Sequence, residues 1–214
     1  MSELLEKTRR ISRFIQESTG FPSDFNDLAK VLSEEVAANV YVVARRGKLL
    51  GYGFMEGFDC DVAAGYVGNG GTFPKECADW LLRIIEASEN IRHDPGKCFL
   101  GAEVKCGFPE KFLTVVPIYA GGDRMGTLVL ARFEREFSDD DLVLAEYAAT
   151  VFGMEILRSR TGQIEEEARK KASVQMALDT LSFSEQEAVE HIFRELGGDE
   201  GLLVASKIAD KVGI

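Results

Sequence analysis

The stretch "FLTVVPIYAGGDRMGTLVLARF", residues 112–133, decides the fold of this chain. Two runs rich in apolar and β-branched residues flank the turn Gly121-Gly122-Asp123, a pattern typical of a β-hairpin. Glycine-rich turns can also cradle phosphates, but a phosphate loop needs a following helix and a Gly-Lys-Ser/Thr ending. Here both flanks have strand patterns, and Arg124-Met125 replaces Lys-Ser. The sequence therefore predicts a plain hairpin.

A second hairpin is predicted over residues 39–54, "NVYVVARRGKLLGYGF", around the basic turn Arg45-Arg46-Gly47-Lys48. A further strand is expected at 98–104, and residues 57–71 read as a glycine-rich loop.

Helical periodicity precedes and follows these strands. It predicts amphipathic helices over residues 3–17 and 21–38, with Ser23 as a cap, and over 72–85. A long helix begins at a capping box of Ser138 and Asp141. The order of elements predicts an α+β fold in which helices pack against an antiparallel sheet.

The C-terminal part is expected to form a separate unit. Ser184 and Glu187 form a predicted capping box, and the last residues, "ASKIADKVGI", read either as an ordinary amphipathic helix or as the first helix of a helix-turn-helix. The capped helix before it and the glycine-containing turn after it favour the helix-turn-helix. The candidate residues of this partial DNA-binding unit are Ala205, Ser206, Lys207, Ala209 and Gly213.

The composition is that of an ordinary globular protein, with 45% apolar and 29% charged residues. Charged residues interrupt the first eighteen positions, and no apolar run approaches the roughly 20 residues that a membrane span needs. We therefore expect a cytoplasmic protein with reduced thiols and no membrane contact. The net charge of −11 opposes non-specific binding to nucleic acid over most of the surface.

The sequence offers little for catalysis or metal binding. The four cysteines form no C-x-x-C pair, the two histidines lie in different predicted units, and no G-x-S-x-G is present. Ordinary thiols are the expected role of the cysteines, and no metal site is predicted.

Two stretches suit small ligands. The cluster Arg45, Arg46 and Lys48 is either a polyanion site or a solvated turn. The segment "GYVGNGGTFPKE", residues 65–76, places a flexible loop and an aromatic residue before a helix N-terminus, which fits a lid over a pocket as well as an irregular connection.

Several stretches together resemble the CodY family of nutrient-responsive transcriptional regulators. They include "VVARRGKLLGY", "TVVPIYAGGDRMGTLVLAR", "FSDDDLVLAEYAATVFGMEILR" and "SEQEAVEHIFRELGGDEGLLVASKIADKVGI". The resemblance implies a GAF domain over 1–137, a linker helix region over 138–181, and the start of a winged helix-turn-helix over 182–214. It also implies that a recognition helix and a wing should follow Ile214, so that this chain is a truncation from which DNA binding is not expected.

The resemblance implies two effectors, GTP and a branched-chain amino acid, isoleucine especially, and no other cofactor. The GTP-binding residues are expected to be Ala44, Arg45, Arg46, Lys48 and Glu155. The amino-acid pocket is expected to contain Val62, Ala63, Phe73, Pro74, Cys98, Leu100, Gly101 and Ala102.

This chain departs from the family's pocket at one position. The family fixes the ligand carboxylate with an arginine where Val62 or Ala63 stands here, and residues 51–74 contain no Arg or Lys. Loss of a charge-assisted hydrogen bond costs about 1.5–3 kcal/mol, roughly ten- to a hundredfold in affinity. Amides at a helix N-terminus could substitute for the arginine.

We therefore expect a metabolite-sensing, homodimeric transcriptional repressor without enzymatic activity. Two alternatives are a small GAF-fold redox enzyme using Cys98 or Cys106, and a purely structural dimerisation module.

Overall fold

The computed structural model describes residues 3–17, 24–58, 60–68, 71–92, 97–108, 110–133 and 135–196, without the side chains at 14, 15, 17, 68, 97, 101–105, 195 and 196. The chain divides into two compact units, Met1–Arg160 and Thr161–Ile214.

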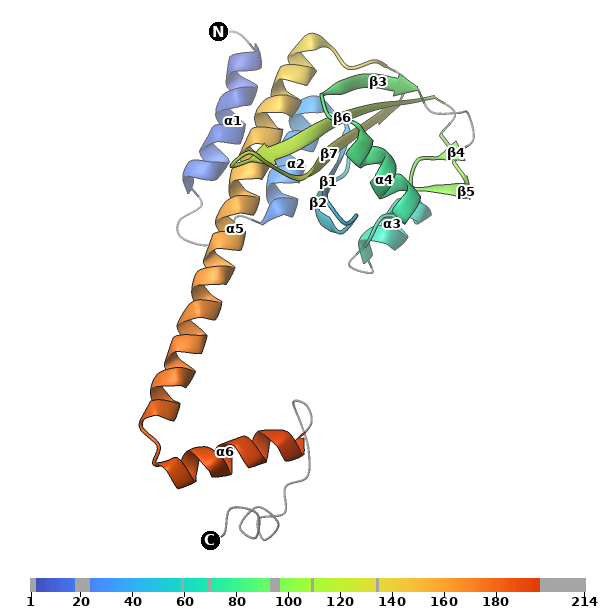
Figure 1. Ribbon diagram of the computed structural model, residues 1–214. Coiled ribbons are helices and arrows are strands. Elements are labelled where there is room, and N and C mark those ends of the chain that lie inside the picture. The colour runs from blue at the N-terminus through green and yellow to red at the C-terminus, as the bar shows by residue number, and fades with distance from the viewer. Residues whose placement is uncertain are drawn as a thin grey trace. The chain divides into compact units, whose positions relative to one another are not determined.

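The first unit is built on a five-stranded sheet in the order β2-β1-β7-β6-β3, with every neighbouring pair antiparallel. Its strands are β1 (Asn39–Ala44), β2 (Leu49–Gly53), β3 (Ser88–Arg92), β6 (Lys111–Ala120) and β7 (Asp123–Phe133). Figure 1 shows this sheet between two layers of other elements. Both predicted hairpins and the α+β class are confirmed.

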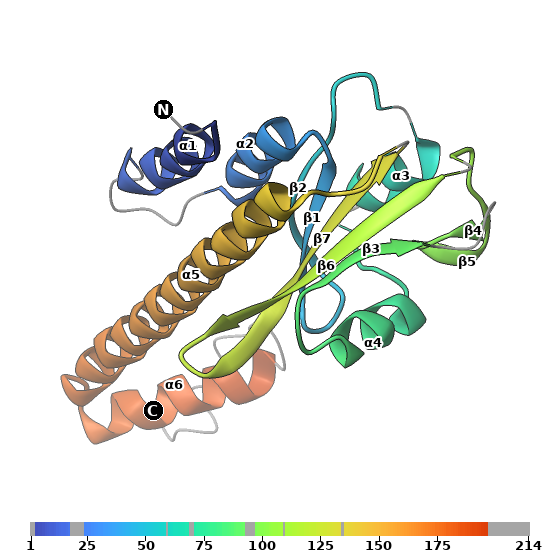
Figure 2. The ribbon, with the colours of Figure 1, turned by 90° about the horizontal axis from the view of Figure 1, so that it is seen from above.

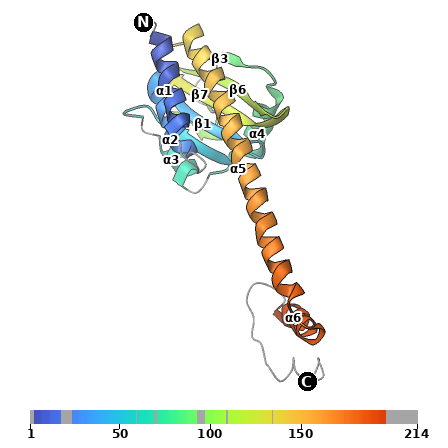
Figure 3. The same cartoon turned by 90° about the vertical axis from the view of Figure 1, so that its left-hand side faces the viewer.

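Three helices cover one face of the sheet, as the view from above shows (Figure 2). They are α1 (Glu3–Glu17), α2 (Phe25–Val36) and the first half of α5 (Asp139–Asp179). Figure 3 shows α1 beside α5, where the hydroxyls of Ser12 and Tyr147 lie 2.7 Å apart. The other face carries α3 (Asp61–Gly68), α4 (Lys75–Arg83), and the small hairpin of β4 (Lys97–Cys98) and β5 (Gly101–Lys105).

Strand alternation divides the core into two clusters, because successive side chains point to opposite faces of a sheet. On β7, Leu128 and Leu130 join the cluster beneath α1, α2 and α5. Val129 and Ala131 join the cluster beneath α3, α4 and β4, which also contains Ala63, Cys77 and Cys98 and which we call the effector-face cluster. A single strand thus contacts both layers.

The long helix begins as the sequence predicts. The backbone N–H of Ser138 donates to Asp141 Oδ2 at 3.0 Å, and the N–H of Asp141 donates to Ser138 Oγ at 3.4 Å, so the two residues form a capping box.

The structure differs from the sequence prediction at four elements. Residues 61–68 form α3 rather than loop, the strand expected at 98–104 is the β4–β5 hairpin, and β3 was not predicted. The predicted helix over 72–85 ends at Arg83. The described cap of α2 is Asp24, whose side chain accepts from the N–H of Asn26; Ser23 lies outside the described residues.

In the second unit, α5 continues to Asp179 and α6 spans Phe183–Leu196. The cap of α6 is Ser182 rather than Ser184, since Glu185 accepts from the backbone N–H of Ser182 at 2.7 Å. The proposed DNA-binding residues at 205–213 lie outside the described part of the chain. Among the described helices, none is both long and apolar enough to cross a membrane.

Candidate functional site

The basic turn between β1 and β2 has a defined backbone and an exposed set of cations. Gly47 has a φ of 82°, and the N–H of Ala44 donates to the carbonyl of Lys48 at 2.8 Å, which closes the turn. Arg45, Arg46 and Lys48 are exposed, so their charged groups are accessible to a dissolved anion.

Hydrogen bonds join this turn to the segment that precedes α4. The N–H of Phe73 donates to the carbonyl of Gly47 at 2.8 Å, and the N–H of Leu49 donates to the carbonyl of Gly71 at 2.9 Å. Lys48 and Thr72 form an isolated antiparallel bridge. The basic turn and the predicted pocket lid are therefore one hydrogen-bonded structure.

Glu155 lies on α5 and is 4% exposed. Its carboxylate is 3.8 Å from Arg158 Nη1. At the end of β1, Ala44 pairs with Gly126 of β7. Met125, which precedes Gly126, contacts α5, since its Sδ accepts from Arg160 Nη1 at 3.3 Å. The basic turn and Glu155 thus belong to the same end of the domain.

The predicted pocket residues converge from four elements. Ala63 on α3, Phe73 before α4, Cys98 on β4 and Leu100 after it are all buried in the effector-face cluster. Val62 packs against this cluster, and Pro74 is the residue that precedes α4. Gly101 and Ala102 lie in β5, and their side chains are outside the described set.

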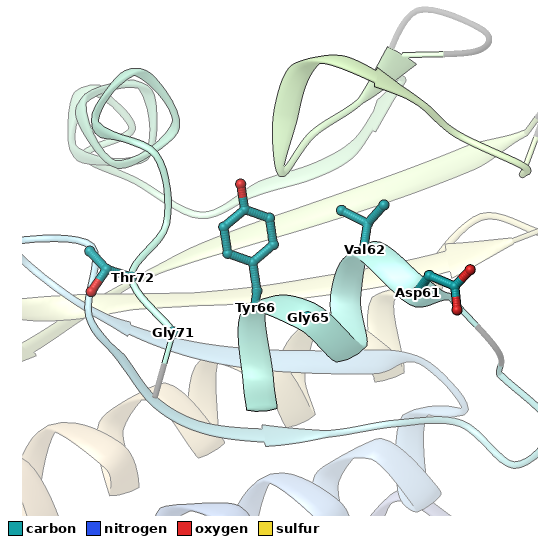
Figure 4. Close-up of a pocket in the computed structure, with 6 residues that line it drawn as sticks. All are labelled: Asp61, Val62, Gly65, Tyr66, Gly71 and Thr72. Atoms are coloured by element: carbon teal, nitrogen blue, oxygen red, sulfur yellow. The ribbon is translucent and has the colours of Figure 1, made fainter. Parts of the chain in front are cut away.

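An open cleft of about 450 Å³ leads toward this cluster (Figure 4). In the close-up, the side chains of Val62 and Tyr66 project from the same side of α3. The cleft is lined by Asp61, Val62, Gly65, Tyr66, Gly71 and Thr72. Sequence reasoning identified only Val62 in this lining, because it assigned the α3 segment to a loop.

Several aromatic rings lie in or against the effector-face cluster. The Tyr41 ring packs edge-on against Phe54, Phe73 and Phe99, with centroid distances of 5.7–6.0 Å. Burial, followed by the nearby thiols of Cys60 and Cys98, raises the pKa of Tyr41, so its hydroxyl is neutral at physiological pH. These aromatic rings favour ligands with an apolar body.

The four cysteines are free thiols gathered in or against the effector-face cluster. Burial raises the pKa of Cys77 to about 11. Burial also raises the pKa of Cys98, although a hydrogen bond from the Leu100 backbone and the charge of Lys111 oppose it. Protonated thiols are poor nucleophiles. Among the described residues, no group of His, Cys, Asp and Glu side chains is placed to hold a metal ion.

The residue that follows the glycine turn of the central hairpin makes structural contacts within the domain. This residue, Arg124, donates to the carbonyl of Ile84 at 2.8 Å and to Thr127 Oγ1 at 2.8 Å. Its guanidinium also lies over the Tyr119 ring at 5.4 Å. These contacts hold the C-terminal end of α4 and support the plain hairpin interpretation.

Two polar residues on the effector face were missed from the sequence, Asn39 and Lys111, which are 0% and 5% exposed. Asn39 Oδ1 accepts from the N–H of Met55 at 2.9 Å. Both residues begin strands. Because side chains along a strand alternate between the two faces, counting from each strand start could have placed these residues on this face.

Comparisons with known proteins give a consistent result. Residues 3–180 match the family described as the CodY GAF-like domain. The chain is 54% identical over 214 residues to the global transcriptional regulator CodY of Clostridium perfringens strain SM101, covering all of this chain and 83% of that protein. It is also 54% identical over 215 residues to CodY of Clostridium botulinum strain Hall, with the same coverage.

Among solved structures, the cofactor-binding GAF domain of the nutrient sensor CodY from Clostridium difficile matches with a TM-score of 0.50 and 40% identity. The match covers 73% of this chain and 99% of that one.

Proposed function

Because the chain belongs to the CodY family of global transcriptional regulators, we propose that its GAF domain senses two metabolites, GTP and an apolar amino acid such as isoleucine. Binding of these effectors would adjust repression through a winged helix-turn-helix that begins near residue 182. Family membership makes the chain a transcriptional regulator and not a redox enzyme that uses Cys98 or Cys106.

The main support for the GTP proposal is the basic turn between β1 and β2. The exposed groups of Arg45, Arg46 and Lys48 suit the triphosphate, since guanidinium groups form charge-assisted hydrogen bonds with phosphate oxygens. The Glu155 carboxylate can accept from the N–H groups of a guanine edge. The proposed role of this site is GTP binding.

The cleft and the aromatic enclosure support the amino-acid proposal. A volume of about 450 Å³ accommodates a small ligand, and Val62 and Tyr66, which line the cleft, offer apolar contacts. The printed description of the C. difficile relative, a cofactor-binding GAF domain of a nutrient sensor, supports the same role here.

We also propose that the protein is a homodimer, since most soluble oligomers are symmetric and an operator with two half-sites matches a two-fold dimer. Sedimentation velocity tests the dimer directly, and a monomer at micromolar concentration would contradict it.

Calorimetric titration with GTP tests the nucleotide site. Arg45→Ala/Arg46→Ala should weaken GTP binding at least tenfold, because each lost charge-assisted bond costs about 1.5–3 kcal/mol. A double variant at exposed arginines elsewhere, Arg83→Ala/Arg135→Ala, removes the same charge and should leave the isotherm unchanged. Equal weakening by both double variants would mean that only general electrostatic attraction is at work.

A further inference from the structure

The four cysteines lie far apart in the sequence but gather on one face of the sheet. Cys77 and Cys98 are buried in the effector-face cluster, whereas Cys60 and Cys106 pack against it and are partly exposed. All four are free thiols. The two partly exposed thiols are therefore the ones that a dissolved oxidant reaches most easily.

Stacked aromatic rings join the two chain segments that carry the partly exposed thiols. Cys60 immediately precedes α3, and its carbonyl accepts from the N–H of Ala64 at 2.9 Å. Cys106 immediately follows β5. Phe58, just before Cys60, stacks on Phe108, just after Cys106, with ring centroids 5.4 Å apart. The start of α3 and the end of β5 therefore lie side by side.

A third ring holds this pair against the sheet. The Phe133 ring, at the end of β7, is 4.3 Å from the Phe108 ring and 5.7 Å from the Phe58 ring, measured between centroids. The interplanar angles are 22° and 10°, so all three rings are stacked. The contact between the two segments is thus part of the domain core.

Tyr41 gives a second indication that the thiols are neighbours. Burial is the main cause of its raised pKa, and three thiols add to the rise, those of Cys60, Cys98 and Cys106. Burial also raises the pKa of Cys98 against a Leu100 backbone hydrogen bond, and the thiols of Cys106 and Cys60 add to that rise. Because charge interactions weaken with distance, these thiols lie near one another and near the tyrosine hydroxyl.

We propose that Cys60 and Cys106 form an oxidisable dithiol, which hydrogen peroxide converts reversibly to a disulfide that joins α3 to β5. The reaction modifies the regulator's own side chains and turns over no other substrate. It therefore goes beyond the proposed function without making the protein a redox enzyme.

The chemistry takes two steps. In the first, the thiolate of one cysteine attacks a peroxide oxygen, the O–O bond breaks, and hydroxide leaves as a sulfenic acid forms. In the second, the thiolate of the other cysteine attacks the sulfenic sulfur, the S–O bond breaks, and a second hydroxide leaves as the disulfide forms. The two thiol protons convert both hydroxides to water, so the sulfurs together lose two electrons and the peroxide gains them. Dithiothreitol reverses the reaction by thiol–disulfide exchange.

Exposure selects this pair over the other thiols. Cys77 and Cys98 are 8% and 6% exposed, and burial raises the pKa of both, so they should react slowly with peroxide. The start of α3 also lines the cleft through Asp61 and Val62. A disulfide at Cys60 would therefore fix one wall of the cleft against the β4–β5 hairpin.

Peptide mapping after peroxide treatment tests the site. The chain is treated with hydrogen peroxide, the remaining thiols are blocked with iodoacetamide, and the digest is analysed by mass spectrometry without reduction. The expected product is a Cys60–Cys106 linkage within one chain, which dithiothreitol removes. Hydrogen exchange at the α3 amides, including Ala64 N–H, should be slower in the oxidised protein than in the reduced protein.

Matched cysteine variants identify the partners. Cys60→Ser and Cys106→Ser should each abolish the intramolecular linkage, whereas Cys77→Ala and Cys98→Ala should form it like the unmodified chain. Circular dichroism shows whether each variant is folded. If a serine variant fails to fold, the linkage mapped in the unmodified chain still decides the assignment.

Four results would overturn the proposal: a linkage that contains Cys98 or Cys77, crosslinks only between chains, oxidation of Cys60 and Cys106 without any linkage, or unchanged exchange in α3 after the linkage forms. None of these measurements uses GTP or isoleucine. Failure of the dithiol therefore leaves the proposed function intact, and absence of effector binding leaves the dithiol intact.

Discussion

Arg132 Nη1 lies 2.8 Å from Asp141 Oδ2, and the two side chains are only 2% and 13% exposed. The same guanidinium donates to the carbonyls of Val36 and Ala37, at the end of α2, and stacks over the Phe137 ring at 4.2 Å. Arg132 on β7 therefore bonds both to the end of α2 and to the start of α5. Because Ala131 beside it belongs to the effector-face cluster, β7 connects that cluster to the long helix.

Replacement of Arg132 should be severely destabilising. Arg132→Met removes the charged partner of the Asp141 carboxylate and the donor to three carbonyl groups, and removal of one partner from a buried pair costs about 3–5 kcal/mol. Arg92→Met breaks the exposed pair with Glu136, whose side chains are 75% and 56% exposed, and should cost less than about 1 kcal/mol. Urea unfolding measures both, and similar losses in the two variants would contradict a special role for Arg132.

The Asp141 pair should also contribute to acid stability. Burial tends to raise the pKa of Asp141, but hydrogen bonds from Arg132 and Ser138 outweigh it and hold the pKa below the usual 3.8. A lowered folded-state pKa gives stability that is fully present above pH 3.8 and is lost as the pH falls through the folded value. Asp141→Asn should therefore flatten the pH dependence of the unfolding free energy below about pH 4. An unchanged slope would show that other carboxyls dominate.

Gly47 should couple the basic turn to the pocket lid. A Cβ at Gly47 would lie 3.0 Å from the Phe73 carbonyl oxygen and 3.2 Å from Ala78 Cβ, so Gly47→Ala should displace the lid and weaken both GTP and isoleucine binding. Gly57 also has a positive φ, 73°, but a Cβ there meets nothing within 4 Å. Gly57→Ala thus has the same backbone strain without the contact. Equal effects of the two variants on ligand binding would argue against coupling.

Gly153 should be required for the docking of α5. Glycine to alanine normally stabilises a helix by about 0.5–1 kcal/mol. At Gly153 the new Cβ would lie 2.5 Å from the Tyr119 carbonyl oxygen, so Gly153→Ala should instead destabilise the domain. Gly162, later in α5, has nothing within 4 Å and should show the normal gain. Circular dichroism during thermal unfolding distinguishes the signs, and a gain at Gly153 would contradict the close packing.

The thiols should differ in reactivity with iodoacetamide. Cys77 and Cys98 are 8% and 6% exposed and have raised pKa values, so they should be alkylated slowly at pH 7.5. Cys60 and Cys106 are partly exposed and should react first. Mass spectrometry of digested samples gives the order of labelling. Rapid labelling of Cys77 in the folded protein would show that the effector face opens.

The main hairpins could be predicted because their signals are local. The glycine turn at 121–122 lies between two apolar strands, and strand periodicity recurs on both sides of Gly47. The capping box of α5 was found for the same reason. At α6, however, Ser182/Glu185 and Ser184/Glu187 both fit the capping pattern, and the sequence does not distinguish them.

The missed elements depend on tertiary contacts. β3 is polar, "SENIR", and its Asn90 has a φ of 51°. The Asn90 side chain exchanges two hydrogen bonds with the Phe137 backbone, at 3.0 and 2.7 Å, and this distant contact holds it. Similarly, α3 contains Gly65 and is followed by glycines, so burial of Ala63 against the sheet outweighs its weak helix propensity.

The candidate site could be predicted only in part. Basic residues in a hairpin turn are visible in the sequence, whereas only the strand register shows that Asn39 and Lys111 share a face of the sheet. The pairing of β1 and β6 with β7 supplies that information.

Calorimetric titration of the chain with GTP and then with isoleucine tests the central claim most directly. Sensing of two effectors predicts a saturable isotherm for each, with isoleucine still binding when GTP is saturating. A chain that is folded by circular dichroism but gives no binding heat with either compound would contradict the account.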